Sequence, residues 1–376
     1  MAIAGGNITL DSTEGMDKIT STEKVTSPYH SDGNTTLLAT SIVSSSQTGQ
    51  ATNETYFFGI ANSSTPTVQE WNVAFGSTNG FGSDDDDNVI KAPTDAIYKQ
   101  YASILLAPTE VTGGFFISSP ASAATKAVSS GKDEEIFVLS ARRSNMKDRI
   151  NKGTWTVALS GSTSNSQSGA PLLELTDDSV NNSPTATPAG DRYNIVSGSA
   201  GTVKTAASVR NFGFFYPDMG ILVFSQAELS ASIPGEHANK NDVVTFNNFK
   251  HMGFGVSTDL DTNEKTGLRF INCLTSIGDT DGTGAKLTFR DEEDQVSAQY
   301  FCRVKSGQMN FSNNPTFVSG SLNELRQKTM KGQPNTFITS VQLYNDSGEM
   351  VAVGNLSTPL KKNHSSEATI KVKLTY

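Results

Sequence analysis

The side chains that most often carry chemistry in proteins are few in this sequence and lie far apart. A histidine can act as a general base once folding brings a carboxylate beside it, but such a meeting in space leaves no mark in the sequence. None of the four histidines has a second metal ligand at short spacing: they are His30, His237, His251 and His364. The sequence also lacks a Gly-x-Ser-x-Gly elbow and a Walker-type Gly-Lys-Ser/Thr loop. It therefore predicts no catalytic residue and no cofactor-binding residue.

Acidic stretches raise the question of a Ca²⁺ site or a pair of catalytic carboxylates. The four carboxylates of Asp84–Asp87 repel one another, and we expect a solvated loop. Residues 279–283 begin like a Ca²⁺ loop, but Arg290 stands where a bidentate Glu is needed, so a Gly-rich turn is the better interpretation. The carboxylates of 292–294 are interpreted as the solvated end of a strand. A glycosidase pair is defined by its separation in space, which the sequence does not give, and no metal site is predicted.

A basic cluster occupies the segment 142–152. Its members are Arg142, Arg143, Lys147, Arg149 and Lys152. Contact with a phosphate backbone is one interpretation, but the formal net charge of the chain is -9, and nucleic-acid affinity depends on clustered cations. We interpret the cluster as surface charge, or as a patch that meets acidic groups on a neighbouring protein, on a short helix capped by Ser144.

The composition predicts a mainly β protein. Only 36% of the 376 residues are hydrophobic, and Ser, Thr, Asn and Gly fill much of the remainder, as in short strands joined by many turns. The 20 Phe, 9 Tyr and 2 Trp provide anchors for a core, so the composition is not that of a disordered chain. We expect a mainly β (α+β), multi-domain chain of antiparallel sheets or sandwiches with a few short helices.

Cysteine usage and the length of apolar stretches indicate the compartment in which the chain folds. Cys273 and Cys302 are too few for a secreted disulfide framework, and Cys302 is interpreted as a small buried hydrophobe. The first residues lack the basic and apolar regions of a signal peptide. No stretch approaches the ~18 apolar residues of a membrane span. We expect synthesis in a cytoplasm and no membrane insertion.

Three domains are expected, covering residues 1–120, 121–298 and 299–376. The first is β-rich and contains one amphipathic helix at 94–106, which Thr94 caps and Pro108 ends. The apolar stripe of this helix consists of Ile97, Tyr101, Ile104 and Leu105. The helix should pack on a sheet that includes residues 56–60.

The second domain is expected to combine strands with long Ser/Thr/Asn loops. A hairpin at 212–224 turns at Pro217–Gly220, where Pro and Gly suit the turn geometry. Residues 161–190 are predicted to form a long exposed loop. Further strands are expected at 135–140, 155–160, 266–273 and 285–290.

The third domain is expected to be an α/β module that ends in an integral strand. Ser321 and Glu324 form a capping box that predicts a helix to about Lys331. A hairpin is expected around Asn345–Gly348. Residues 369–376 alternate strictly between apolar and polar side chains, which predicts a strand with one buried face.

Several stretches together resemble structural proteins of contractile-tailed phages of the T4-like and cyanophage type. They span about residues 135–376. The motifs are Phe137–Arg143 with Met146–Trp155, Phe215–Ile221, Tyr300–Lys305, Asn310–Phe317, Phe337–Asn345, Leu356–Lys362 and Val372–Leu374. Residues 56–111 more faintly resemble the start of a baseplate wedge protein, in which a Phe-rich strand, a Pro-containing loop and an amphipathic helix occur in that order.

This resemblance implies a structural subunit of a bacteriophage virion, in the tail of a myovirus and made in the host cytoplasm. The most specific expectation is a baseplate (wedge-like) component that holds neighbouring tail proteins together. A neck, collar or head-associated protein, a receptor- or carbohydrate-binding tail module, and a β-rich glycan hydrolase are the alternatives. The resemblance implies no enzymatic activity. It implies other tail and baseplate proteins as partners and assembly in multiple copies or by self-association, without nucleic acid.

Overall fold

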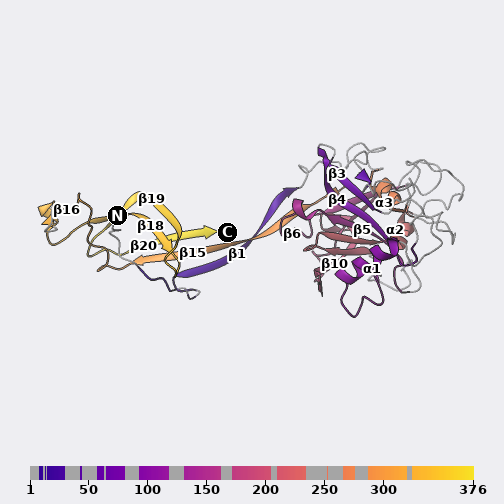
Figure 1. The fold of residues 1–376 in the computed structure, drawn as a ribbon, viewed down its shortest axis with the longest axis horizontal. Coiled ribbons are helices and arrows are strands. Elements are labelled where there is room, and N and C mark those ends of the chain that lie inside the picture. The colour runs from indigo at the N-terminus through magenta and orange to yellow at the C-terminus, as the bar shows by residue number, and fades with distance from the viewer. Residues whose placement is uncertain are drawn as a thin grey trace. The chain divides into compact units, whose positions relative to one another are not determined.

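The computed structural model describes residues 8–11, 13, 15–29, 43–44, 57–62, 65–80, 93–117, 131–161, 172–204, 210–233, 252, 266–275, 287–319 and 324–376. The chain forms two compact units (Figure 1). Residues 25–293 form the central unit, and residues 1–24 together with 294–376 form the terminal unit. All strand pairs with a defined register are antiparallel, so the mainly β prediction is confirmed.

These units differ from the three expected domains. Strands on either side of the expected boundary at 120/121, β4 and β5, pair in one sheet and cannot belong to separate domains. The second boundary, expected at 298/299, lies at 293/294, and the first 24 residues join the C-terminal residues. Sequence composition marks loops, whereas a domain boundary depends on which strands pair, and that is not local information.

The central unit is organised around one curled antiparallel sheet. Its strand order is β14-β7-β8-β10-β12-β13-β5-β4-β3-β2, and β9 and β11 each pair with β10. The strands are β2 (Val43–Ser44), β3 (Phe57–Asn62), β4 (Thr65–Ser77), β5 (Glu135–Ala141), β7 (Thr156–Ser160), β8 (Leu172–Asp177), β9 (Thr185–Thr187), β10 (Gly190–Ser199), β11 (Thr202–Val203), β12 (Asn211–Tyr216), β13 (Ile221–Ser225) and β14 (Leu287–Thr288). The predicted hairpin is confirmed as β12 and β13, with a turn at Pro217–Gly220.

Neighbouring residues of the middle strands belong to two different hydrophobic clusters. On β5, Phe137 and Leu139 lie in one cluster, and Ile136 and Val138 lie in the other. Successive side chains of a strand point to opposite faces, so this sheet is covered on both sides. A strand buried on both faces is apolar at nearly every position, as in Asn211–Tyr216.

Three α-helices complete the described part of the central unit: α1 (Pro93–Leu105), α2 (Gln226–Ser232) and α3 (Thr266–Thr275). Leu105 of α1 belongs to the cluster that contains Ile136. Leu229 of α2 and Phe270 of α3 belong to the cluster that contains Phe137. The helices therefore cover opposite faces of the sheet. None of them is long and apolar enough to cross a membrane.

Helix α1 confirms the helix predicted at 94–106, and it packs on β4, which pairs with β3. Its buried face is displaced from the predicted stripe, however. Tyr98 and Ala102 are buried together with Leu105, whereas Ile104 is 42% exposed. Tyr98 can be buried because its hydroxyl donates to the carbonyl of Asp133 at 2.8 Å.

The strand predicted at 266–273 is wrong, because these residues form α3. Gly267, Phe270, Ile271 and Leu274 are all buried, and they are spaced by three and four residues. That is the repeat of one helix face. Phe270 lies 5.3 Å from Phe137 and 5.4 Å from Phe224, measured between ring centroids, so α3 packs directly on the sheet.

The exposed loop predicted at 161–190 is wrong in part, because β8 and β9 lie within it. Thr176 and Asp177 of β8 are fully buried. Their polar atoms are satisfied: Thr176 Oγ1 donates to the carbonyl of Trp155 at 2.8 Å, and Asp177 accepts from the Gly153 amide. The polar composition of the segment therefore predicted a loop where part of the chain forms a buried strand.

The terminal unit contains the pairing of β1 (Lys18–Tyr29), β15 (Arg290–Val304) and β20 (Ala368–Thr375), in that order. The unit boundary falls inside β1, after Lys24, and inside β15, before Asp294. The predicted last strand is confirmed as β20, with Tyr300 of β15 opposite Val372. Its apolar face is only half-buried. Cys302 is buried, as expected.

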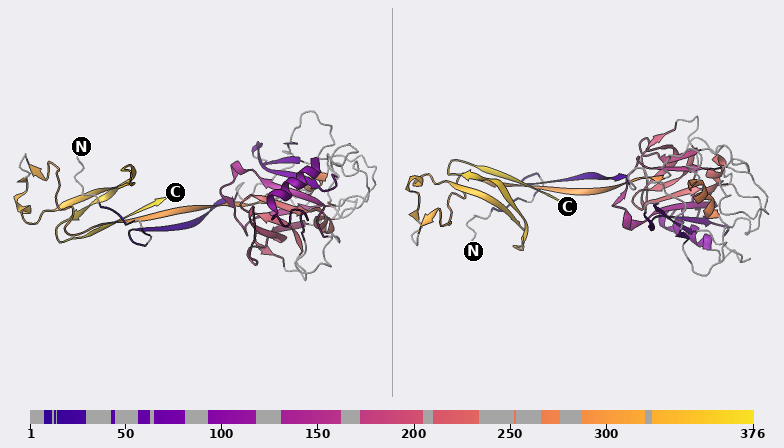
Figure 2. Two further views of the ribbon diagram at one scale, coloured as in Figure 1. Left: turned by 60° about the horizontal axis from the view of Figure 1, so that its bottom comes forward. Right: turned by 90° about the horizontal axis from the view of Figure 1, so that it is seen from above.

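The rest of the described terminal unit consists of β16 (Val318–Ser319), β17 (Glu324–Leu325), the 3-10 turn η6 (Lys328–Met330), β18 (Thr336–Tyr344) and β19 (Met350–Lys362). The predicted hairpin is confirmed as β18 and β19 (Figure 2). The helix predicted from Ser321 to about Lys331 is wrong over the described residues 324–331, since Glu324 belongs to a strand that pairs with β16 and only one 3-10 turn follows. Ser321 itself lies outside the described residues.

Candidate functional site

The basic segment 142–152 is held between two other parts of the central unit. It contains the 3-10 turn η4 (Arg143–Asn145) and the short strand β6 (Arg149–Ile150). β6 pairs with Asp291 and Glu292 at the start of β15. The Ile150 amide donates to the carbonyl of Pro217 in the β12–β13 turn at 3.1 Å. The expected helix is thus a single 3-10 turn, and Ser144 lies inside it rather than at its N-cap.

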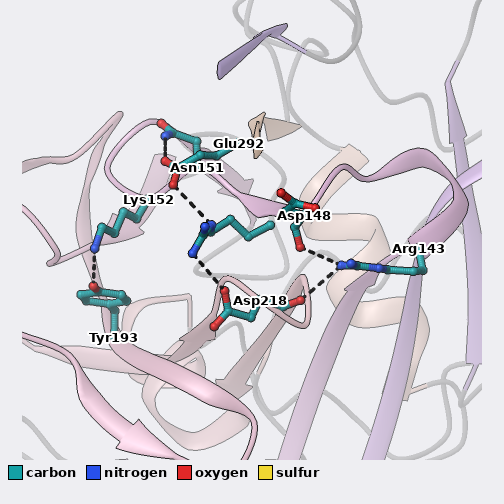
Figure 3. Close-up of polar contacts among 8 residues, drawn as sticks. Arg143, Asp148, Asn151, Lys152, Tyr193, Asp218 and Glu292 are labelled. Carbon is teal, nitrogen blue, oxygen red and sulfur yellow. Dashed lines mark hydrogen bonds and ion pairs between the residues drawn. The ribbon is translucent and has the colours of Figure 1, made fainter. Parts of the chain in front are cut away.

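Arg149 lies between two carboxylates from different elements, Glu292 and Asp218, both of which are labelled in Figure 3. Its Nε atom is 3.3 Å from Glu292 Oε1, and its Nη1 atom is 3.7 Å from Asp218 Oδ1. Asn151 Nδ2 donates to Glu292 Oε2 at 2.6 Å. Glu292 is 5% exposed, so the expectation of a solvated carboxylate is wrong there. A carboxylate buried to this degree requires a cation and hydrogen bonds to remain charged.

Arg143 and Lys147 fasten the outer part of the segment. Arg143 Nη1 donates to the carbonyls of Asp148 at 2.9 Å and Asp218 at 3.3 Å. Lys147 Nζ lies 2.9 Å from Glu293 Oε2, and the hydrogen bond and charge of Glu293 raise the pKa of Lys147. Lys147 and Arg149 therefore have acidic partners within the same chain.

The segment ends with Lys152, which contacts Tyr193 of β10. Lys152 Nζ donates to Tyr193 Oη at 2.7 Å and lies 5.1 Å from the centroid of its ring. This hydrogen bond is the main cause that raises the pKa of Lys152. The next amide, of Gly153, donates to both carboxylate oxygens of Asp177 at 2.9 and 3.0 Å. Gly153 has φ +71°, a conformation in which glycine is favoured.

A charged cluster is formed by the cations Arg143, Lys147, Arg149 and Lys152 with their partners. These cations contact carboxylates, carbonyls or a phenol of the chain itself. Among the described residues, no group of three or more His, Cys, Asp and Glu is placed to hold a metal ion. The arrangement can hold the start of β15 against the β12–β13 turn.

Two further polar clusters were missed by sequence reasoning. Asp133 is 1% exposed, and its carboxylate accepts hydrogen bonds from Ser225 Oγ at 2.6 Å and from the Ile117 amide at 2.7 Å. Near it, burial and then the charges of Glu134 and Asp133 raise the pKa of Glu135 to about 7. No local pattern could have identified these residues, because their partners are distant in sequence.

The second missed cluster surrounds Lys362, which is fully buried in the terminal unit. Its three donors are satisfied by the carbonyl of Ser306 at 3.0 Å, Asn310 Oδ1 at 2.9 Å and the carbonyl of Asn363 at 2.8 Å. This lysine therefore has a structural role. It ties the end of β19 to the segment after β15.

The remaining sequence candidates do not converge on a site. His364 is exposed in the connection between β19 and β20. The acidic run Asp84–Asp87, residues 279–283 and the three other histidines lie outside the described residues. In comparisons with protein-family models, curated proteins and solved structures, none matches this chain.

Proposed function

We propose that this chain is a structural subunit of a contractile-tailed phage virion, in the baseplate (wedge-like) part of the tail, where it holds neighbouring tail proteins together. The proposal joins the sequence resemblance to one physical observation. That observation is the surface of the terminal unit, which carries apolar side chains without a core of its own.

Neither hydrophobic cluster contains a residue of the terminal unit. The buried apolar residues among its described positions are Ala298, Cys302, Val304 and Val318. Its exposed large apolar residues are Met16, Ile19, Phe311, Phe337, Tyr344, Met350, Val351, Val353, Leu360 and Tyr376. A unit of this size that leaves most of its described large apolar side chains exposed or half-buried gains little from hydrophobic burial by itself.

Exposed apolar surface of this extent is typical of proteins that bind other proteins. A subunit of an assembly buries such a surface against its neighbours, and the central unit, with a cluster on each face of its sheet, supplies the rigid part. The charged cluster also supports the proposal, because it holds the start of β15 in place within the central unit. A tail component that bears load during contraction needs contacts that resist separation of its strands.

The test is to find the chain in particles of the phage that encodes it. Density-gradient-purified virions should contain the chain in a fixed ratio to known tail proteins, measured by quantitative mass spectrometry. Electron microscopy of the same particles should place it in the baseplate. Presence of the chain only in the soluble fraction of infected cells, with none in washed particles, would overturn the proposal, and density at the neck would move it to the alternative position.

A further inference from the structure

Strand β18 has one backbone edge without a partner among the residues that the structure describes. Its nine residues, Thr336–Tyr344, pair on the other side with β19, and the two strands form a sheet of their own. Among the described residues, no backbone hydrogen bond of β18 goes elsewhere. A two-stranded hairpin alone is marginally stable in water, and an unpaired edge is a template for a further strand.

The two outer edges of this hairpin differ in how they are protected. β19 contains Pro359, which has no amide hydrogen, and it carries the exposed Lys361 near its end. Proline and lysine are devices that block pairing at an edge. β18 contains no proline, no glycine and no charged residue. The edge of β18 is therefore the one suited to accept another strand.

The side chains of β18 are arranged in a nearly symmetric way about its middle. Phe337 and Tyr344, at opposite ends, are 58% and 49% exposed. Ile338 and Leu343, next to them, are half-buried. The register of β18 shifts between Ile338 and Ser340, and this irregularity lets Phe337 and Tyr344 share the exposed face while Ile338 and Leu343 share the other. If a second β18 pairs antiparallel, Phe337 of one copy lies beside Tyr344 of the other, and Ile338 lies beside Leu343. Aromatic and aliphatic cross-strand pairs of this kind stabilise sheets.

The charges at the two ends of the hairpin are complementary to those of an antiparallel copy. Asp346 and Glu349 lie in the exposed turn beyond Tyr344. Lys361 is opposite Phe337, at the other end, and is also exposed. Antiparallel pairing brings the acidic end of one hairpin to the basic end of the other, whereas parallel pairing brings like charges together.

We infer that β18 pairs antiparallel with β18 of a second copy of this chain, joining two hairpins into one four-stranded sheet about a two-fold axis. The inference names a partner for the surface on which the proposed function rests. It commits to a copy of the same chain rather than to a different tail protein, because sequence symmetry and charge are both self-complementary.

Variants at Ser340 test the two-fold arrangement. Ser340 is exposed and in this register lies opposite Val341 of the second copy, directly beside the axis, so two copies of any charge introduced at 340 are close neighbours. The full chain should sediment at twice 40.0 kDa. Ser340→Lys and Ser340→Glu should each weaken self-association about tenfold or more, since like charges oppose one another. An equimolar mixture of the two variants should restore it.

The matched control is Ser357→Lys, on the exposed part of β19, which should leave self-association unchanged. Circular dichroism should confirm that all variants keep their strands. A wild-type chain that sediments as a monomer at all concentrations overturns the inference, as does a mixture of Lys and Glu variants that associates no better than either alone. Location of the chain in virions tests the proposed function separately, so a monomer that is found in the baseplate refutes only this inference.

Discussion

Arg149 provides a sharp test of the charged cluster. The substitution Arg149→Met keeps the apolar stem of the side chain and removes the cation beside Glu292. Glu292 is a buried carboxylate, and in this variant it keeps the hydrogen bond from Asn151. We expect the central unit to lose stability, because this carboxylate loses the cation of Arg149.

The size of the loss follows from burial and geometry. Removing one partner of a buried ion pair costs about 3–5 kcal/mol. The Arg149 side chain is 27% exposed, so solvent already screens part of the interaction, and the bond from Asn151 survives. We therefore expect a loss of about 2–3 kcal/mol in the free energy of unfolding.

Tryptophan fluorescence during urea unfolding measures this loss of stability, because it reports on the central unit. Both tryptophans of the chain, Trp71 and Trp155, are 1% exposed and belong to a cluster of the central unit. Lys147→Met is the matched control: its ion pair with Glu293 is exposed, so its removal should shift the urea midpoint far less.

A double-mutant cycle with Glu292→Gln decides whether the ion pair causes the effect. With a neutral amide at position 292, the removal of the Arg149 cation should cost at least about 1 kcal/mol less than in the wild type. If the two losses simply add, or if Arg149→Met is no more damaging than Lys147→Met, the assignment of Arg149 as the counter-ion of Glu292 is refuted.

Three further perturbations test other parts of the fold. The folded-state pKa of Glu135 lies above its ordinary value, so the native state holds the proton more tightly, and the free energy of unfolding should fall as pH rises from 4.5 to about 7. In urea titrations, Glu135→Gln should flatten this pH dependence and gain about 1–3 kcal/mol of stability at pH 8. An unchanged pH profile of the variant would contradict this expectation. Gly220→Ala should cost about 1–2 kcal/mol, measured by the same fluorescence, because Gly220 has φ +66° and its new Cβ would lie 2.5 Å from Met146 Sδ; wild-type stability would count against that contact. Deletion of residues 369–376 should abolish amide-exchange protection of β15 residues opposite β20, since that ladder is lost; retained protection there would show that β20 is dispensable.

Elements with a strong local signal were predictable from the sequence. The turn at Pro217–Gly220 and the turn at Asn345–Gly348 carry their geometry in their own residues, and both hairpins are confirmed. Helix α1 ends before Pro108 as predicted, although it begins at Pro93, so Thr94 lies inside the helix and not at its cap. The strand prediction at 266–273 failed because a short run of aromatic and aliphatic residues suits a strand and a buried helix equally. Only the spacing of the buried residues by three and four distinguishes the helix.

The sequence predicted the cations of the charged cluster but not their partners. The cations at 142–152 were visible as a run, but their partners are distant in sequence: Glu292 and Tyr193 lie in strands, and Asp218 lies in a turn. A strand buried on both faces shows no alternation, so burial at the start of β15 could not be inferred from its acidic sequence. Lys362 presents the same difficulty, because a lysine beside an exposed Lys361 gives no sign that it is buried.

The pairing of β1 with β15 has a consequence for the order in which the protein forms during synthesis. The two strands lie far apart in sequence, as shown by the hydrogen bond from the Asp291 amide to Ser27 Oγ, which spans 264 positions. The strands of the central sheet are made after β1 and before most of β15. They can therefore pair with one another while β1 is still without β15. β18 is made later still. The apolar edge of the hairpin therefore reaches solvent only after the strands of the central sheet have been translated, so nascent chains cannot associate through it before that point.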